Sequence, residues 1–395
     1  MFHKGRTGIA PASLPRANKK GVKETSSPNQ WLEPRVVEGL RGEECAVIAV
    51  GSSHCVACGR SGDCFVWGDN DAGQLGLGSF ASFSSVAINH SFPPVATVSA
   101  GANHSVALTS NGSLYSWGHG LNGRLGNNAV HRIGVPDSEK SYFNIPYTIS
   151  EIEPIRLVSC GADHTLAVGS SGVWAWGCGS GGKLGLGDTQ DRWRPSLIPR
   201  TRAAIAVAAG TWHSLMVLCF PPMLHGGYVY SFGSGYHGQL ALGDKQVATT
   251  PELVEYFASY HLLVKHISAG SHHCGAITTG RLRFITKSCV DYVYILDGEL
   301  YTWGSNKYNC LGRTIDELDV EYTPAPGHCG GFGALVDGIG RGLVRQVSCG
   351  KEFTIVSTWP YDGPDLATAQ LIIEEQNQSS GDNDSASFYS SSVFV

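Results

Sequence analysis

The sequence predicts an all-β protein, a single β-propeller of six to seven four-stranded blades that is closed by its N- and C-terminal strands. Three observations support this prediction. A Gly-x-x-His motif recurs at a period of about 50 to 60 residues, an aromatic-Gly pair follows most copies, and short apolar runs are joined by Asn-Gly or Gly-Asp corners. Four-stranded units that repeat radially form a propeller.

The Gly-x-x-His motif has five copies and one altered copy, each preceded by an apolar residue. Its Gly and His residues are Gly51 and His54, Gly101 and His104, Gly161 and His164, Gly210 and His213, and Gly270 and His273, and the altered copy runs from Gly350 to Phe353. The aromatic residues of the downstream pairs are Trp67, Trp117, Trp176, Phe232 and Trp303. A turn of the Gly-x-Leu-Gly type follows each pair.

We interpret these repeated positions as structural. The Trp side chains offer large flat surfaces that suit the space between adjacent blades. The five histidines come one per blade, so we expect buried imidazoles bonded to neighbouring backbone rather than a catalytic cluster. Phe353 supports this view, because the altered copy keeps the position without a ring nitrogen. We predict no catalytic residue.

Composition limits the classes of partner. The chain carries 51 Gly and a net charge of −5, with 42% apolar and 15% charged residues. That charge argues against a body that binds nucleic acid through a basic surface. No run of eighteen apolar residues occurs, so we expect no membrane contact.

Three segments are expected. Residues 1–30 form a disordered leader with six Lys or Arg and one acidic residue, Glu24. Residues 31–359 form the propeller, and residues 360–395 form a disordered, acidic and Ser-rich tail. The leader has three readings: a plain disordered segment, a nuclear-targeting or DNA-contacting arm, or an organelle transit peptide. The expected location is therefore nuclear or cytoplasmic, with organelle import as the alternative.

The combined motif resembles the repeat of the regulator of chromosome condensation family. That motif is Gly-x-x-His followed by Ser, Thr or Cys, about 13 residues to Trp-Gly, then Gly-(Gln/Arg/Lys)-Leu-Gly. The resemblance implies a propeller, usually of seven blades, that serves as a non-catalytic protein-interaction platform. The alternative it implies is a guanine nucleotide exchange factor for a Ran-type small GTPase, with a small GTPase or chromatin protein as partner.

A second alternative is an ultraviolet-B photoreceptor, because the plant ultraviolet-B receptor shares the fold that the resemblance implies. Its Gly-Trp-Arg-His-Thr repeat has its nearest copy here at Gly210-Thr211-Trp212-His213-Ser214. The Trp is shifted in this copy and the Arg is absent.

Two intervals depart from the repeat. The segment Pro34-Arg35-Val36-Val37 resembles a last blade strand, and we predict that it joins the sixth unit in one closing blade. From His to Trp the fifth unit spans 30 residues where the first spans 13. Removing residues 280–296 restores the shorter spacing, so we predict an insert there, either a splice insert or an evolved loop.

No metal or cofactor is expected. His54, Cys55 and Cys58 have the spacing of a metal cluster, but Cys55 and Cys58 stand three apart on one strand and so point to opposite faces. The chain holds no Gly-x-x-x-x-Gly-Lys-Ser/Thr phosphate loop.

The loops after the aromatic-Gly pairs vary most between units, and variable loops on a repeated frame suit a binding surface. The candidate partner-binding residues are Asp69, Asp71, Tyr236, His237, Lys307 and Tyr308. For the exchange-factor alternative the acidic loop residues are Asp69, Asp71, Asp188 and Asp244.

Overall fold

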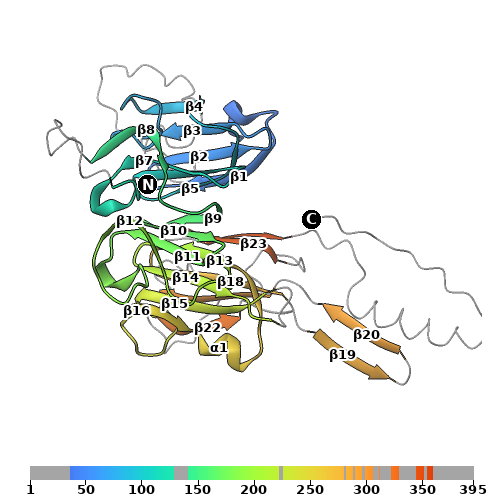
Figure 1. Cartoon of the computed structure of the whole chain (residues 1–395). Coiled ribbons are helices and arrows are strands. Elements are labelled where there is room, and N and C mark those ends of the chain that lie inside the picture. Colours follow the sequence, from blue (N-terminus) through green and yellow to red (C-terminus); the bar gives the residue numbers. More distant parts are fainter. Residues whose placement is uncertain are drawn as a thin grey trace, which may run out of the picture.

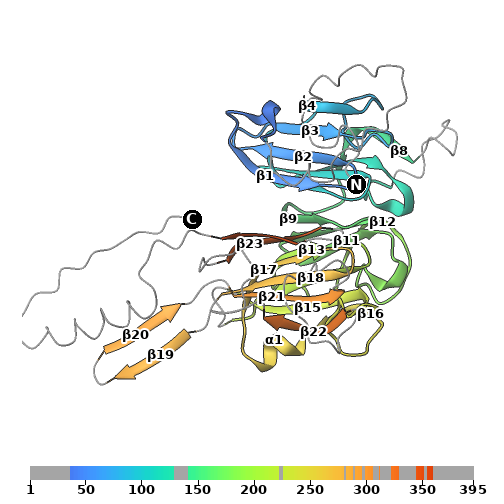
Figure 2. The same ribbon diagram turned by 180° about the vertical axis from the view of Figure 1, so that it is seen from behind.

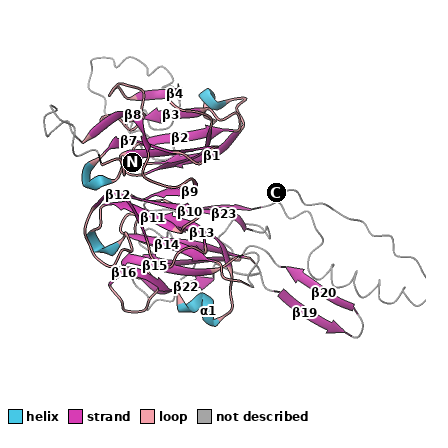
Figure 3. Cartoon of the chain, viewed as in Figure 1, coloured by secondary structure: helices cyan, strands magenta, loops and turns pink. Residues whose placement is uncertain are grey.

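The computed structural model describes residues 36–128, 141–221, 226–279, 282–287, 290–295, 299–305, 311, 322–328, 344–350 and 354–358. These residues are predominantly strands (Figures 1 and 3). They form five four-stranded sheets and two two-stranded sheets, all antiparallel within the pairs described. The predicted all-β propeller is confirmed.

The five four-stranded sheets are blades built from consecutive units of the sequence. Blade 1 holds β1 (Cys45–Val50), β2 (His54–Gly59), β3 (Cys64–Gly68) and β4 (Phe83–Asn89), and blade 2 holds β5 (Val95–Ala100), β6 (His104–Thr109), β7 (Leu114–His119) and β8 (Tyr142–Ile149). Blade 3 holds β9 (Ile155–Cys160), β10 (His164–Gly169), β11 (Val173–Gly177) and β12 (Arg192–Leu197).

The remaining units follow the same order. Blade 4 holds β13 (Ala204–Ala209), β14 (His213–Leu218), β15 (Tyr228–Ser234) and β16 (Val247–Leu253), and blade 5 holds β17 (Val264–Ala269), β18 (His273–Thr278), β21 (Leu300–Ser305) and β22 (Tyr322–His328). Strands β23 (Val344–Cys349) and β24 (Thr354–Thr358) pair as the start of a sixth unit. A short α1 (Glu255–Ser259) connects blades 4 and 5.

The repeated glycines set the register of each central hairpin. In blade 1, His54 lies opposite Gly68, and the other four blades show the same pairing of the motif His with the Gly of the aromatic-Gly pair. Gly68 has a φ of +107°, and a Cβ there would lie 2.5 Å from the carbonyl oxygen of Ser53. Only Gly meets both demands, because it tolerates positive φ and adds no side chain.

Apolar side chains fill the space between neighbouring blades. Trp117 packs among residues of blades 1 and 2, and Trp176 among residues of blades 2 and 3. Phe232 lies between blades 3 and 4, and Trp303 between blades 4 and 5. The core is therefore a series of joints between sheets, each with one large aromatic side chain.

The N-terminal strand predicted around Val36 and Val37 is wrong for these two residues. Val37 caps a one-turn 3-10 helix, η1 (Glu38–Leu40), instead of entering a sheet. The physical reason is that Leu40 packs against the apolar cluster of Phe65 and Trp67 in blade 1. In the described part of the chain, β23 and β24 pair only with each other.

The segment between β18 and β21 lies outside the blade. Strands β19 (Leu282–Lys287) and β20 (Val290–Ile295) pair only with one another, and both views place them away from the propeller body (Figures 1 and 2). Ile277 still pairs with Leu300, and the Thr278 amide donates to the Glu299 carbonyl over 3.0 Å. Blade 5 thus forms across the interruption with the register of the other blades.

Antiparallel strands place the connections alternately on two faces of the propeller. We call one the front face, which holds the connections between first and second strands and between third and fourth strands. Its described residues are 51–53, 69–82, 101–103, 120–128, 161–163, 178–191, 210–212, 235–246 and 270–272. The rear face holds the other connections, including residues 60–63, 254–263 and the β19–β20 hairpin.

Candidate protein-interaction face

The motif histidines tie each blade to the next through side chains. The Nε2 atom of His54 lies 2.9 Å from the Oγ of Ser105 in blade 2. His104 contacts Thr165, His164 contacts Ser214, His213 contacts the Cys274 thiol and His273 contacts Thr354, all at 2.8 to 3.1 Å. The expected bond from the imidazole to neighbouring backbone is therefore wrong for His54, His104, His164 and His213, because Nε2 contacts a side chain of the next blade and Nδ1 has no partner among the described residues.

A backbone carbonyl completes the same joint. The Gln74 carbonyl, in the Gly-x-Leu-Gly turn of blade 1, accepts from Ser105 Oγ and from the Trp117 indole N–H, both over 2.8 Å. The Arg124 carbonyl does the same for Thr165 and Trp176. In blade 5 the Trp303 indole donates to the carbonyl of Gln239 in blade 4 over 2.9 Å. The repeat thus fixes neighbouring blades by polar bonds as well as by packing.

The motif glycines lie where adjacent blades approach most closely. A Cβ on Gly51 would lie 2.5 Å from the carbonyl oxygen of Gly101, and one on Gly101 would lie 2.5 Å from that of Gly161. The same contact links Gly210 to Gly270, and Gly270 to Gly350. Any side chain at these positions forces the blades apart.

Burial keeps these histidines neutral. It lowers the pKa of His54 to about 4 and that of His213 to about 3, and it lowers the pKa of His104 and His164 well below the ordinary value. The Nδ1 atoms of all four are buried without a partner. Since each imidazole is sealed inside a joint, none is placed to exchange protons with a substrate.

Large side chains are exposed on the front face of blade 4. Trp212 is 44% exposed and Tyr236 is 59% exposed. His237, also exposed, makes an edge-to-face contact with His272 of blade 5, with ring centroids 4.6 Å apart. Two of the candidate partner-binding residues, Tyr236 and His237, therefore lie beside the Gly-x-x-His connections.

The Lys183–Asp163 ion pair lies beside the Trp212 ring. Lys183, in the Gly-x-Leu-Gly turn of blade 3, is completely buried, and its Nζ donates to Asp163 Oδ1 over 2.6 Å. The same Nζ lies 5.3 Å from the centroid of the Trp212 ring. This ammonium-to-ring contact holds one side of the indole while almost half of the side chain faces solvent.

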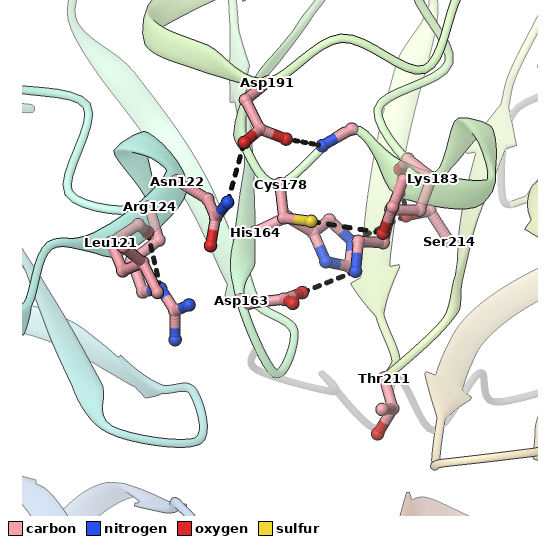
Figure 4. A network of polar contacts seen from close by, with 12 residues as sticks. Leu121, Asn122, Arg124, Asp163, His164, Cys178, Lys183, Asp191, Thr211 and Ser214 are labelled. Carbon is pink, nitrogen blue, oxygen red and sulfur yellow. Dashed lines mark hydrogen bonds and ion pairs between the residues drawn. The ribbon is translucent and has the colours of Figure 1, made fainter.

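Arg124 occupies the turn position of Lys183 one blade earlier. The residue is 7% exposed, and its Nε donates to the Leu121 carbonyl over 2.9 Å. Figure 4 shows Arg124 on the blade 2 loop, with Asp163 between it and Lys183 in this view. Burial lowers the pKa of Arg124, against the raising effect of Asp163 and Asp191.

The loops of blades 2 and 3 are fastened to each other. Asp191 accepts from the Asn122 side-chain amide over 2.7 Å through Oδ2 and from the Gly179 backbone amide over 2.9 Å through Oδ1 (Figure 4). Asn122 has a φ of +59° inside η2 (Leu121–Gly123), a conformation that Asn tolerates better than most residues. The surface around Arg124 is therefore preorganised.

The other predicted loop residues lie elsewhere. Asp69 and Asp71 are on the front face of blade 1, where Asp69 is half-buried and Asp71 is exposed, and Asp244 is exposed on blade 4. Asp188 is paired with Arg192 over 2.6 Å. The acidic residues thus belong to three different blades. Lys307 and Tyr308 lie outside the described residues.

Sequence reasoning did not select Arg124, Lys183 or Trp212 as contact residues. The sequence shows that the second residue of the turn is Gln, Arg or Lys, but only the structure shows which of these side chains forms an ion pair. An Arg or Lys that replaces Gln in a repeated turn was the available signal.

The cysteines of blade 1 pack into two different apolar clusters. Cys55 packs in the cluster beside η1, whereas Cys58 and Cys64 pack toward blade 2. Burial raises the pKa of Cys55 to about 11 and raises that of Cys64 further, so both thiols stay protonated at neutral pH. Among the described residues no group of three or more His, Cys, Asp or Glu has a metal-binding arrangement.

The described helices are too short or too polar to cross a membrane.

Four-stranded blades that repeat along the chain and are bonded to each other define a class of proteins, the β-propellers. The family is shown by sequence: the model of the RCC1-like domain matches residues 4–354, and the chain belongs to this family.

Relatives and solved structures agree with this assignment. The chain is 32% identical to the ultraviolet-B receptor UVR8 of Arabidopsis thaliana over 333 residues, which cover 82% of this chain and 65% of UVR8. It is also 32% identical to the E3 ubiquitin-protein ligase HERC2 of Mus musculus, over 76% of this chain and 6% of HERC2. The chain therefore spans less than two thirds of either relative.

The fold is similar to that of yeast RCC1 (Prp20) in its complex with Kap60. The TM-score is 0.60 at 23% identity, over 82% of this chain and 70% of the yeast chain. A second structure, of Prp20p from Saccharomyces cerevisiae, has a TM-score of 0.51 at 19% identity, over 87% of this chain and 89% of that chain, and was described with its binding to Gsp1p and histones. At these identities the similarity shows the fold.

Proposed function

We propose that the protein is a non-catalytic interaction platform that binds a protein partner through its front face. The observation that carries the proposal is the exposure of Trp212 and Tyr236 on a frame whose blades are bonded to each other. Trp, Tyr and Arg dominate the energetically important positions of protein interfaces. A rigid frame lowers the entropy lost on binding.

The test compares two variants in affinity capture with quantitative mass spectrometry. Trp212→Ser removes the front-face indole, and Ser is the residue that blade 1 carries at the same position, Ser53. Tyr260→Ser removes a side chain that is 61% exposed on the rear face. Proteins lost with Trp212→Ser and retained with Tyr260→Ser support the proposal. Identical capture by both variants contradicts it.

Guanine nucleotide exchange on a Ran-type GTPase is the alternative. It draws on the binding of Gsp1p described for Prp20p, a similar fold. The acidic front-face residues Asp69, Asp71 and Asp244 are spread over blades 1 and 4. Release of a fluorescent GDP from the GTPase separates the two functions. The platform predicts no acceleration, whereas acceleration in proportion to the concentration of this protein supports exchange.

We further propose that one more blade lies against blade 1 in the complete ring, in keeping with the six to seven blades predicted. Ile48 and Val50 of β1 are 55% and 67% exposed, whereas Val98, the equivalent of Ile48 in blade 2, is 4% exposed. The buried Trp67 indole N–H has no acceptor, although Trp117, Trp176 and Trp303 each donate to the preceding blade. Both features support a missing neighbour.

A further inference from the structure

The Gly-x-Leu-Gly turns use their second residue differently from blade to blade. In blade 1 the side chain of Gln74 accepts from the Ala72 amide over 2.9 Å, and in blade 4 that of Gln239 accepts from the His237 amide over 2.8 Å. In blade 3 Lys183 is committed to Asp163. Each of these three side chains thus bonds within its own loop or blade, although the Nε2 of Gln239 is buried without a partner.

Arg124 differs from these side chains in its charge: unlike the two Gln it is a cation, and unlike Lys183 it forms no ion pair with a described residue. Its Nε is bonded to the Leu121 carbonyl. Its two Nη atoms are not among the buried side-chain nitrogens that lack a hydrogen-bond partner, and 7% of the residue is exposed. A guanidinium stays charged in proteins and presents its donors in a planar fork.

The carboxylates near Arg124 are engaged with other groups. Asp163 accepts from Lys183, and both oxygens of Asp191 accept hydrogen bonds from the blade 2 and blade 3 loops. The charges of Asp163 and Asp191 offset part of the hydration that this nearly buried cation has lost, but it forms no ion pair with a described residue, so the compensation is incomplete. An anion supplied from outside restores that loss.

We propose that Arg124 is a subsite for the side-chain carboxylate of an acidic segment in the protein partner. The inference rests on the proposed platform function and names the chemistry that the front face recognises. The planar fork of Arg124 matches a carboxylate in two parallel hydrogen bonds. Trp212 lies on the same face as an aromatic anchor for the rest of the segment (Figure 4 shows the neighbouring Thr211).

Local charge favours a carboxylate over a phosphate. Arg124 and Lys183 bring two positive charges, and Asp163 and Asp191 bring two negative charges to the same loops. A singly charged carboxylate meets little net repulsion there, whereas a phosphate brings about −1.5 to −2 charges. Carboxylate and phosphate can both bind a guanidinium, so the experiment compares peptides that carry one or the other.

The test measures binding of fluorescein-labelled peptides to the full chain by fluorescence anisotropy at low salt. The peptides contain six Glu, six Gln, or phosphoserine in a Gln background. The variant Arg124→Gln keeps the backbone of the joint, because Gln stands at this position in blades 1 and 4. The matched control is Arg60→Gln, which removes an exposed Arg from the rear face.

We expect the six-Glu peptide to bind more tightly than the six-Gln peptide and Arg124→Gln to weaken it tenfold or more, as for loss of a hydrogen bond to a charged group. Arg60→Gln changes the affinity less than twofold. Equal affinities for the six-Glu and six-Gln peptides, or for wild type and Arg124→Gln with matching thermal unfolding, overturn the proposal. Tighter binding of the phosphoserine peptide that is lost in Arg124→Gln also overturns it and assigns the subsite to phosphate.

Failure of this subsite is distinguishable from failure of the platform. The peptide assay measures carboxylate binding at Arg124 alone, whereas the capture experiment with Trp212→Ser measures partner binding by the front face. A platform without a carboxylate subsite gives partner loss in the second assay and no effect in the first.

Discussion

In three of the four described joints between blades 1 to 5, one backbone carbonyl accepts two donors from the next blade, and in the joint of Lys183 it accepts one, because Phe232 replaces the Trp. For Gln74 these donors are the Ser105 hydroxyl and the Trp117 indole. Because the acceptor is a backbone carbonyl, the joint does not depend on the side chain at this turn position. That side chain is Gln, Arg or Lys in different blades. The backbone carbonyl of this turn residue therefore holds the fold, whereas its side chain varies from blade to blade.

The Trp67 and Trp117 pair tests this joint. Trp117→Phe leaves the Gln74 carbonyl with one donor fewer, so we expect a loss of about 1 kcal/mol in the free energy of unfolding beyond the loss of ring size. Trp67→Phe makes the same change in ring size but removes an indole N–H that has no acceptor. Urea unfolding of both variants measures the difference. Equal losses contradict the role of the indole hydrogen bond.

The buried histidines predict how stability depends on pH. Burial lowers the folded-state pKa of His213 to about 3, with the charges of His273 and His272 as smaller causes, while the unfolded value is about 6.5. Below pH 6.5 the unfolded chain binds a proton that the folded chain refuses. Stability is thus complete above that pH and falls as pH drops toward the folded pKa.

His213→Phe removes one such group and retains an aromatic ring, as Phe353 does in the sixth unit. The variant loses the contact with Cys274 at every pH, but its loss of stability between pH 7.5 and pH 5.0 is smaller than that of wild type by about 1 to 2 kcal/mol. Urea midpoints at the two pH values give the comparison. Parallel pH profiles for the two proteins refute the buried neutral imidazole.

At the residue level the sequence predicted the burial of the motif positions but not their partners. The residue after each motif His is Ser, Thr or Cys in the described joints, and this regularity was the signal for an acceptor in the next blade. The open guanidinium of Arg124 gave no such signal. Its lack of a paired carboxylate depends on how loops of two blades meet, which residue spacing does not encode.

At the scale of the element, the central hairpin of blade 5 keeps the strand pairing of the other blades although a segment is inserted at its corner. In blade 2 the Thr109 amide donates to the Ser113 carbonyl around a three-residue corner that ends in Gly112, with φ of +84°. In blade 5 the Thr278 amide donates to the Glu299 carbonyl in the same way. The hairpin closes at the same position although about twenty residues intervene.

Deletion of residues 280–296 is expected to leave the fold intact. It joins Thr279 to Asp297-Gly298, a three-residue corner that matches Ser110-Asn111-Gly112 of blade 2. We expect the midpoint of thermal unfolding to be equal or higher, because a shorter loop loses less entropy on closure. Near-ultraviolet circular dichroism reports the packing of Trp303. A deletion variant that aggregates or loses this signal shows that the insert supports blade 5.

Hairpins were the elements that sequence predicted best, because Gly at a corner and an apolar run on each side are local signals. The segment at Val36 and Val37 shows the limit. Its residue types suit a strand, yet the one-turn helix η1 forms there because Leu40 finds an apolar site on blade 1. Tertiary packing outweighs strand propensity in so short a segment.

At the scale of the whole molecule, the antiparallel order of the strands places different connections and side chains on the two faces. The front face carries Trp212, Tyr236 and Arg124, whereas the rear face carries tight corners, α1 and the β19–β20 hairpin. Sequence predicted that one face would bind and named Tyr236 and His237 on it. It left the number of blades open, because ring closure depends on contacts between distant parts of the chain.

The most direct test of the interaction face replaces one surface tyrosine at a time by the photo-crosslinking residue p-benzoylphenylalanine. Tyr236 on the front face and Tyr260 on the rear face form a matched pair, at 59% and 61% exposure. After irradiation in a cell extract, crosslinked products are separated by mass. We expect a discrete partner band from the Tyr236 position that Trp212→Ser abolishes, and none of the same mass from the Tyr260 position. The same band from both positions, or a band that persists in Trp212→Ser, contradicts binding through the front face.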